Sequence, residues 1–78
     1  MNNANLEIML TKLGLSVENK GMQLKVWSCN CLDYHSARLW INKTGRTTIK
    51  TLGIQKSFDI KYMDTKHLKE ELMGFEII

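Results

Sequence analysis

Several signals that mark membrane and secreted proteins are missing from this sequence. It has no proline, no internal repeat and no apolar run approaching the length of a membrane span. Its first ten residues contain neither the basic segment nor the apolar segment of a secretory signal peptide. We therefore expect a cytoplasmic protein with no membrane partner, in a compartment where thiols stay reduced.

Groups of catalytic side chains are equally scarce. The sequence has no glycine-rich phosphate-binding loop and no cluster of carboxylates. A chain of 78 residues also leaves little room for the enclosed pocket that catalysis requires. These features predict that the protein is not an enzyme and uses no cofactor.

The two cysteines form a C-x-C pair, Cys29 and Cys31, close to His35. Zinc prefers four nitrogen or sulfur ligands, and only His67 is left to complete such a set. A second cysteine pair is absent, and C-x-C is tighter than the usual structural spacing. Cys31 with His35 as nucleophile and base would lack an orienting third group. We expect no metal here and no disulfide, and the sequence assigns the cysteines no role.

The positive charge is concentrated in the middle of the chain. The composition, 44% hydrophobic and 24% charged, is that of one small globular domain spanning residues 1–78. Between residues 34 and 58 there are five Lys or Arg and no acid, so the remainder of the +3 chain sums to −2. This asymmetry favours an anionic partner, although lysines that protect a sheet edge would give the same pattern.

Residues 36–52 predict a β-hairpin with two different faces. The loop is Lys43-Thr44-Gly45, with Gly45 in the left-handed conformation that a three-residue loop favours. Side chains alternate along strands, so one face is largely aliphatic and the other is cationic around Trp40. In this register Arg38 lies opposite Lys50, and Trp40 lies opposite Thr48.

Residues 3–13 and 65–73 predict two short helices. The first has an apolar stripe at helical spacing, with Asn3 as N-cap and Gly14 as the stop. The second follows Asp64 as N-cap, and Leu68 with Leu72 forms its apolar pair.

Alternation predicts further strands at residues 15–18, 22–30 and 57–62, with residues 53–56 as a link. In the strand 22–30, Met22 points to the core together with Leu24 and Val26. The predicted fold class is α+β, an antiparallel sheet of three to five strands with an N-terminal and a C-terminal helix packed on one face.

The opposite sheet face is the candidate binding surface. Cations neutralise phosphates, and aromatic rings stack on unpaired bases, so this face suits RNA or single-stranded DNA. The alternative is that both tryptophans are covered, by the apolar tail 75–78 or by a second copy of the chain. The predicted site comprises Lys25, Trp27, Arg38, Trp40, Lys43, Arg46 and Lys50.

Other functions fit the same pattern. The order helix, three strands, helix is similar to that of the double-stranded RNA-binding domain, but the turn at residues 64–67 carries one lysine where that domain has a cluster. Small phage or mobile-element proteins that inhibit a host enzyme or defence complex are also of this size, and they would use the same Arg and Trp side chains as anchors. A homodimer formed through the sheet edge or the tail 75–78 is a third alternative.

Overall fold

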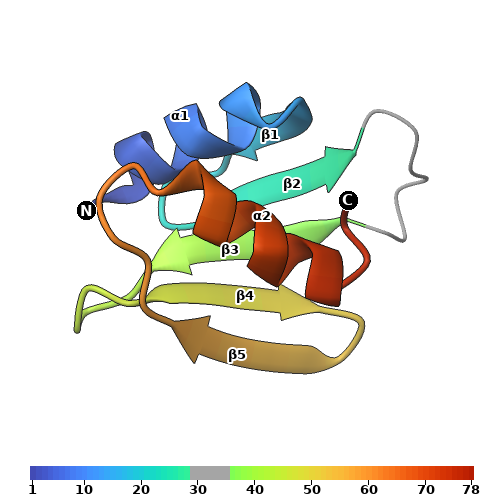
Figure 1. Cartoon of the computed structure of the whole chain (residues 1–78). Helices are drawn as coiled ribbons and strands as arrows, with labels where there is room; N and C mark the ends of the chain where they lie inside the picture. The colour runs from blue at the N-terminus through green and yellow to red at the C-terminus, as the bar shows by residue number, and fades with distance from the viewer. Residues whose placement is uncertain (29–35) are drawn as a thin grey trace.

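Two helices lie on one face of a five-stranded antiparallel sheet (Figure 1). This computed structural model describes residues 1–28 and 36–78. The strands lie side by side in chain order, from β1 at one edge to β5 at the other. The elements are α1 (Asn3–Lys12), β1 (Leu15–Asn19), β2 (Leu24–Ser28), β3 (Ala37–Ile41), β4 (Thr47–Thr51), β5 (Ile54–Phe58) and α2 (Thr65–Gly74). The predicted α+β fold class is confirmed, with five strands.

The N-cap of α1 is Asn2, so the prediction of Asn3 was wrong. The Asn2 side chain accepts a hydrogen bond from the Asn5 N–H at 2.9 Å, and the Asn5 side chain accepts one from the Asn2 N–H at 3.1 Å. This reciprocal capping satisfies two amides that the helix leaves unpaired. Asn3 instead ties α1 to the sheet, because its Oδ1 accepts from the Ile41 N–H at 2.8 Å and its Nδ2 donates to the Met22 carbonyl at 3.2 Å.

The N-cap of α2 is Asp64, as predicted. Its carboxylate accepts a hydrogen bond from the His67 N–H at 3.1 Å. Leu68 and Leu72 are both fully buried, which confirms that they form the apolar side of this helix. Among the helices of the described residues, none combines the length and apolarity needed to cross a membrane.

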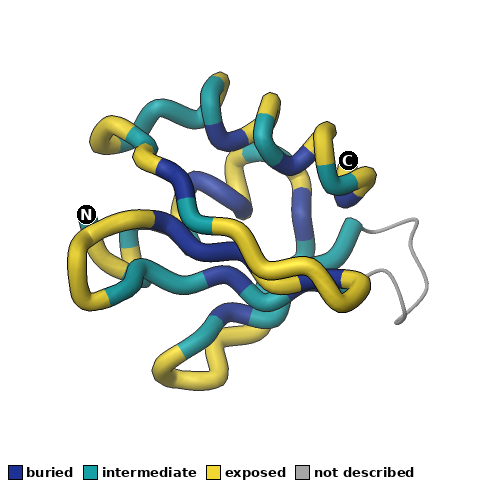
Figure 2. Tube along the Cα trace, turned by 90° about the horizontal axis from the view of Figure 1, so that it is seen from below, coloured by how far each residue is buried: buried dark blue, intermediate teal, exposed yellow. Residues whose placement is uncertain are grey.

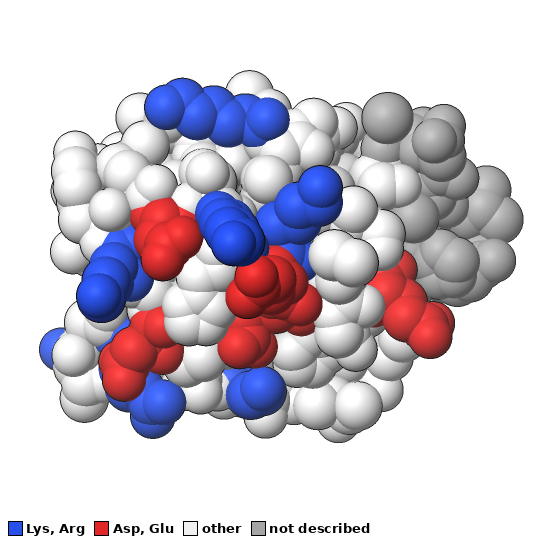
Figure 3. Space-filling model, viewed as in Figure 1, with Lys and Arg blue, Asp and Glu red and all other residues white. Residues whose placement is uncertain are grey.

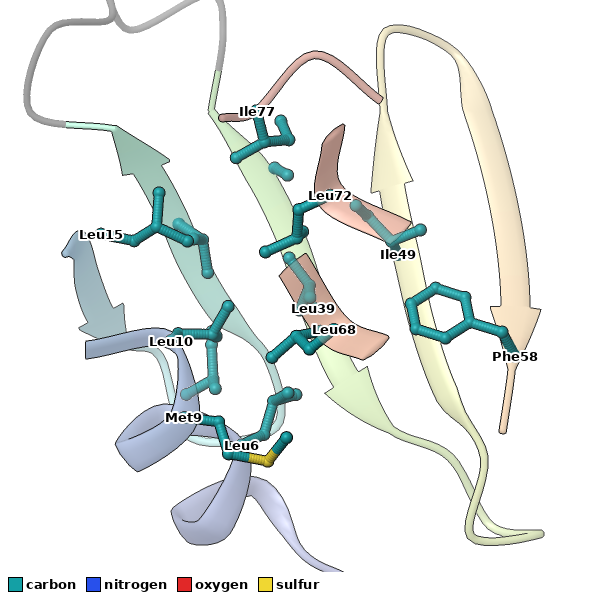
Figure 4. Close-up of a cluster of buried hydrophobic side chains, with 13 residues drawn as sticks. Leu6, Met9, Leu10, Leu15, Leu39, Ile49, Phe58, Leu68, Leu72 and Ile77 are labelled. Atoms are coloured by element: carbon teal, nitrogen blue, oxygen red, sulfur yellow. The ribbon is translucent and has the colours of Figure 1, made fainter. Parts of the chain in front are cut away.

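The core lies between the helices and one face of the sheet (Figure 4). α1 and α2 supply leucines and Met9, which pack on aliphatic side chains from the strands. Ile77, beyond the end of α2, is only 2% exposed and belongs to the same cluster. The tail 75–78 therefore inserts Ile77 into the core instead of adding a strand or covering the far side of the sheet.

The strand β2 begins at Leu24, so the assignment of Met22 to the core was wrong. Met22 is 87% exposed because residues 20–23 form the turn between β1 and β2. In that turn Gly21 has a φ of +90°, and the Lys20 N–H donates to the Gln23 carbonyl at 2.9 Å. The predicted end of this strand, together with Cys29, Cys31 and His35, lies outside the described residues.

The last strand, β5, occupies the segment that was predicted to be a link. Leu52 and Gly53 alone connect β4 to β5, and both have positive φ, +50° and +78°. Such two-residue turns normally carry Asn-Gly or Asp-Gly, so Leu-Gly gave no signal in the sequence. The strand prediction for residues 57–62 was wrong beyond Phe58, since Tyr62 is exposed in the connection to α2.

Candidate nucleic-acid interface

The hairpin formed by β3 and β4 has the predicted register. Arg38 pairs with Lys50, Leu39 with Ile49, and Trp40 with Thr48. Gly45 has a φ of +83°, and its N–H donates to the Asn42 carbonyl at 2.9 Å. Buried and half-buried residues alternate along β2 and β3, as Figure 2 shows for the central strands. The side chains of Arg38, Trp40 and Lys50 therefore lie on the open face, away from the helices.

A row of polar side chains crosses all five strands on this face. Glu18 pairs with Lys25, Lys25 with Arg38, Arg38 with Lys50, and Lys50 with Gln55. Residues paired in this way project from the same side of the sheet. Neighbouring strands are about 4.8 Å apart, so the backbone positions of Lys25 and Lys50 are separated by roughly 10 Å. We call Lys25, Arg38 and Lys50 the basic row.

In the part of the chain that the structure describes, no residue of the basic row forms an ion pair with a carboxylate. The ion pairs there join Lys20 to Glu18, Arg46 to Asp59, and both Lys56 and His67 to Glu71. Like charges on directly opposed residues are destabilising. The adjacent cations therefore create a surface that attracts anions.

Glu18, at the β1 end of the row, is the nearest acid by register. Its carboxylate lies 2.7 Å from the Lys20 ammonium. The pKa of Glu18 is lowered, first by the hydrogen bond from Lys20, then by the charge of Lys20, and less by the charges of Lys25 and Arg38. Glu18 therefore stays ionised beside the basic row and marks its edge.

The two tryptophans flank the basic row on opposite sides. Trp27 lies two residues beyond Lys25 on β2, and Trp40 two residues beyond Arg38 on the antiparallel β3. Both are half-buried. The tail 75–78 does not account for this burial, because its Ile77 belongs to the core on the helix side.

Each tryptophan has different neighbours on the open face. The Lys25 ammonium lies 5.6 Å from the centroid of the Trp27 ring, within cation–π range. Trp40 is paired with Thr48, which is only 2% exposed although it faces away from the helices. The Thr48 hydroxyl also lies 2.9 Å from the Ser57 hydroxyl on β5. Trp40 therefore lies beside a polar part of the sheet while keeping some of its surface exposed.

Two of the seven predicted site residues lie apart from the row, at the end of the β3–β4 hairpin. Arg46 is partly neutralised, because its Nε lies 3.3 Å from Asp59 and it donates to the Ser57 carbonyl at 3.2 Å. Lys43 is exposed in a loop that Asn42 holds, since the Asn42 carboxamide oxygen accepts from the N–H groups of Thr44 and Arg46. The structure thus groups Lys25, Trp27, Arg38, Trp40 and Lys50, and leaves Lys43 and Arg46 at the periphery.

The opposite side of the molecule has a different charge pattern. Figure 3 shows Lys and Arg interspersed with Asp and Glu on the face that carries α2. Within residues 1–28 and 36–78, no three His, Cys, Asp or Glu side chains are placed to hold a metal ion. The sequence reasoning missed Glu18 and Gln55, because their place in the row depends on how β1 and β5 pair with their neighbours.

Comparison with known proteins does not assign a function to these residues. No family model, no curated protein and no solved structure matches the chain.

Proposed function

We propose that this protein is a non-enzymatic module that binds single-stranded RNA or DNA on the open face of its sheet. The observation that carries the proposal is the basic row, Lys25, Arg38 and Lys50, paired side by side between two half-buried tryptophans. Phosphates would neutralise the cations, and unpaired bases would stack on the exposed parts of the indole rings.

The tryptophans favour a single strand over a duplex as the ligand. The faces of paired bases are stacked inside a duplex, whereas a single strand can present its bases to aromatic side chains. A stacked base would take the place of the Lys25 ammonium over Trp27 and release that lysine toward a phosphate. The same face would then bind both the bases and the phosphates of one strand.

Titration of the intrinsic tryptophan fluorescence tests the proposal. Short single-stranded RNA and DNA should quench the emission, because both tryptophans lie beside the proposed path of the ligand. If the basic row neutralises three phosphates, the logarithm of the binding constant should fall with the logarithm of salt with a slope of about −2. Between about 50 and about 200 mM salt, that slope weakens binding roughly 20-fold.

Matched variants locate the binding surface. The double variant Arg38→Ala with Lys50→Ala should lose most of its affinity, and any binding that remains should depend less on salt, while its unfolding free energy stays within about 0.5 kcal/mol of the parent. Lys61→Ala, an exposed lysine in the connection between β5 and α2, is the control and should bind normally. Binding of a matched duplex without quenching, or no binding of any nucleic acid, would overturn the proposal.

A protein partner is the competing function for the same face. Arg38 and Trp40 lie two residues apart on the central strand β3, on the same face, and Arg and Trp are enriched among the residues that dominate protein–protein binding energy. An inhibitor of a host protein would present this face to an acidic surface. The titration separates the two functions, since an inhibitor of this kind has no reason to bind free oligonucleotides with quenching of its tryptophans.

A further inference from the structure

An apolar groove that no residue of the basic row lines lies between the tip of the β4–β5 hairpin and the end of α2. Its volume is about 200 Å³. In Figure 1 the C-terminal end of α2 and the β4–β5 turn lie on the same side of the molecule. The residues that line this hairpin-tip groove are Thr51, Leu52, Ile54, Gly74, Phe75 and Glu76.

The apolar walls of the groove are open to solvent. Leu52 is 66% exposed and Ile54 is 56% exposed, while Phe75 is half-buried. Ile54 is on the helix side of the sheet, because it pairs with the buried Thr51, but α2 ends before covering it. The hairpin tip thus offers branched apolar side chains that the core does not use.

Leu52 occupies a backbone conformation that does not suit it. Its φ is +50°, in a two-residue turn where asparagine or glycine is strongly preferred. The side chain is exposed, so burial does not offset the steric penalty. A departure from local preference without a gain in packing is typical of a functional position. Glu76, on the other side of the groove, also has a left-handed backbone, with a φ of +60°.

The size and charge of the groove define its occupant. Sites for drug-sized molecules are usually about 300–1,000 Å³, so a smaller groove suits one large side chain. Among the described lining residues Glu76 is the only charged one, and it is exposed. A cation next to the inserted side chain would therefore meet a complementary carboxylate.

We propose that the hairpin-tip groove is a docking site for a peptide segment of another protein, in which a large apolar side chain is followed by Lys or Arg. The apolar side chain enters between Leu52 and Phe75, and the cation pairs with Glu76. The site is separate from the basic row, so docking of this peptide and binding of nucleic acid do not compete for the same residues.

The test titrates the whole protein with capped dipeptides at millimolar concentration. Binding is measured from the chemical shifts of the protein's backbone amides. Acetyl-Phe-Arg-amide should cause saturable shifts at Leu52, Ile54 and Phe75. Acetyl-Phe-Glu-amide and acetyl-Gly-Arg-amide should bind several-fold more weakly, because one lacks the cation and the other lacks the apolar side chain. The preference for Arg over Glu should disappear in Glu76→Gln.

Leu52→Asn provides the decisive variant. Asn-Gly suits this turn, so the variant should melt at a higher temperature than the parent while losing the saturable shifts. Met22→Asn, an equally polar change in the exposed β1–β2 turn, should leave dipeptide binding intact. A lower melting temperature for Leu52→Asn would show that Leu52 supports the fold, and would overturn the proposal.

Three other results would also overturn it. These are the absence of saturable shifts in the groove, equal binding of the Arg and Glu dipeptides, and a concentration-dependent dimer that Leu52→Asn abolishes. The last result would make a second copy of the chain the occupant.

Discussion

Arg38 on β3 lies directly opposite Lys50 on β4, and Lys25 on β2 lies opposite Arg38 on its other side. In the described part of the chain, none of the three forms an ion pair with a carboxylate. Opposed like charges destabilise a sheet, and opposed unlike charges stabilise it. The arrangement is therefore poor for folding and suited to holding an anion, which links the local electrostatics to the proposed function.

Replacing one cation of the basic row by an acid should improve stability and remove binding. Lys50→Glu converts a repulsive pair with Arg38 into an attractive one, so the free energy of unfolding should rise by about 0.2–1 kcal/mol. The gain should shrink in high salt, which screens exposed charges. Urea unfolding at two salt concentrations measures the stability, and the oligonucleotide titration measures the binding.

Lys61→Glu is the matched control for this charge reversal. It makes the same change in net charge outside the sheet, in the connection to α2. Its stability and its oligonucleotide affinity should change less than those of Lys50→Glu. A Lys50→Glu variant that is less stable than the parent would contradict the electrostatic account of the basic row.

A pair of substitutions can separate the structural role of Trp40 from the binding role that we propose for it. Trp40→Ala should uncover Thr48 and lower the free energy of unfolding by about 1 kcal/mol, since the half-buried ring covers only part of the sheet. Trp40→Leu keeps an apolar cover and should recover most of that stability. Both variants should bind single strands more weakly, because base stacking on an aromatic ring contributes about 1–3 kcal/mol.

Trp27 remains in both variants as the fluorescent reporter of the titration. If Trp40→Leu binds as tightly as the parent, Trp40 only covers the sheet, and stacking on it is not part of binding. Urea unfolding of the two variants provides the independent measure of that structural role.

The sequence predicted the features that follow from local patterns. Alternation over residues 36–52, together with Gly45, was sufficient for the register of the β3–β4 hairpin, because a slip of one residue would bury its charged side chains. Asp64 was recognisable as a cap, and Leu68 with Leu72 as a core pair, for similarly local reasons. The hairpin prediction places Arg38, Trp40 and Lys50 on the open face, and alternation along the separately predicted strand 22–30 places Lys25 and Trp27 there.

The errors arose where several local choices are equivalent or where tertiary contacts decide. Asn2 and Asn3 are both good caps, and the contacts of Asn3 with Ile41 and Met22 come from distant parts of the chain. The Leu52-Gly53 turn has the wrong first residue for its conformation, so β5 was mistaken for a link. The position of Glu18 in the row likewise depends on the pairing of β1 with β2.

Asn3 should be more important for stability than an exposed polar residue usually is. Asn3→Ala leaves the half-buried N–H of Ile41 without its acceptor, which should cost about 1–3 kcal/mol of unfolding free energy. Asn3→Asp keeps an acceptor at the same place and should lose much less. Urea unfolding gives the two values, and hydrogen exchange of the Ile41 amide should accelerate only in Asn3→Ala. Equal losses for the two variants would mean that the bond to the Met22 carbonyl is the important one.

The ionisation of Glu18 should respond to Lys20 before it responds to the basic row. The hydrogen bond and charge of Lys20 are the largest causes of the lowered pKa, so Lys20→Ala should move the pKa of Glu18 up toward the ordinary value of 4.5. Lys25→Ala should move it in the same direction by a smaller amount, since the charge of Lys25 is a lesser cause. NMR titration of the Glu18 carboxyl carbon measures both changes.

The pairing of Glu18 with Lys20 also predicts how the stability of the protein changes with pH. A carboxyl whose pKa is lowered on folding stabilises the folded state above its ordinary pKa, and this contribution is lost as the pH falls through the lowered value. In Lys20→Ala the acid side of the stability profile should therefore become shallower than in the parent. A larger shift of the Glu18 pKa in Lys25→Ala than in Lys20→Ala would show that the basic row, and not the neighbouring turn, holds this carboxylate. Glu18 would then compete directly with a phosphate for Lys25, and Glu18→Gln should strengthen oligonucleotide binding.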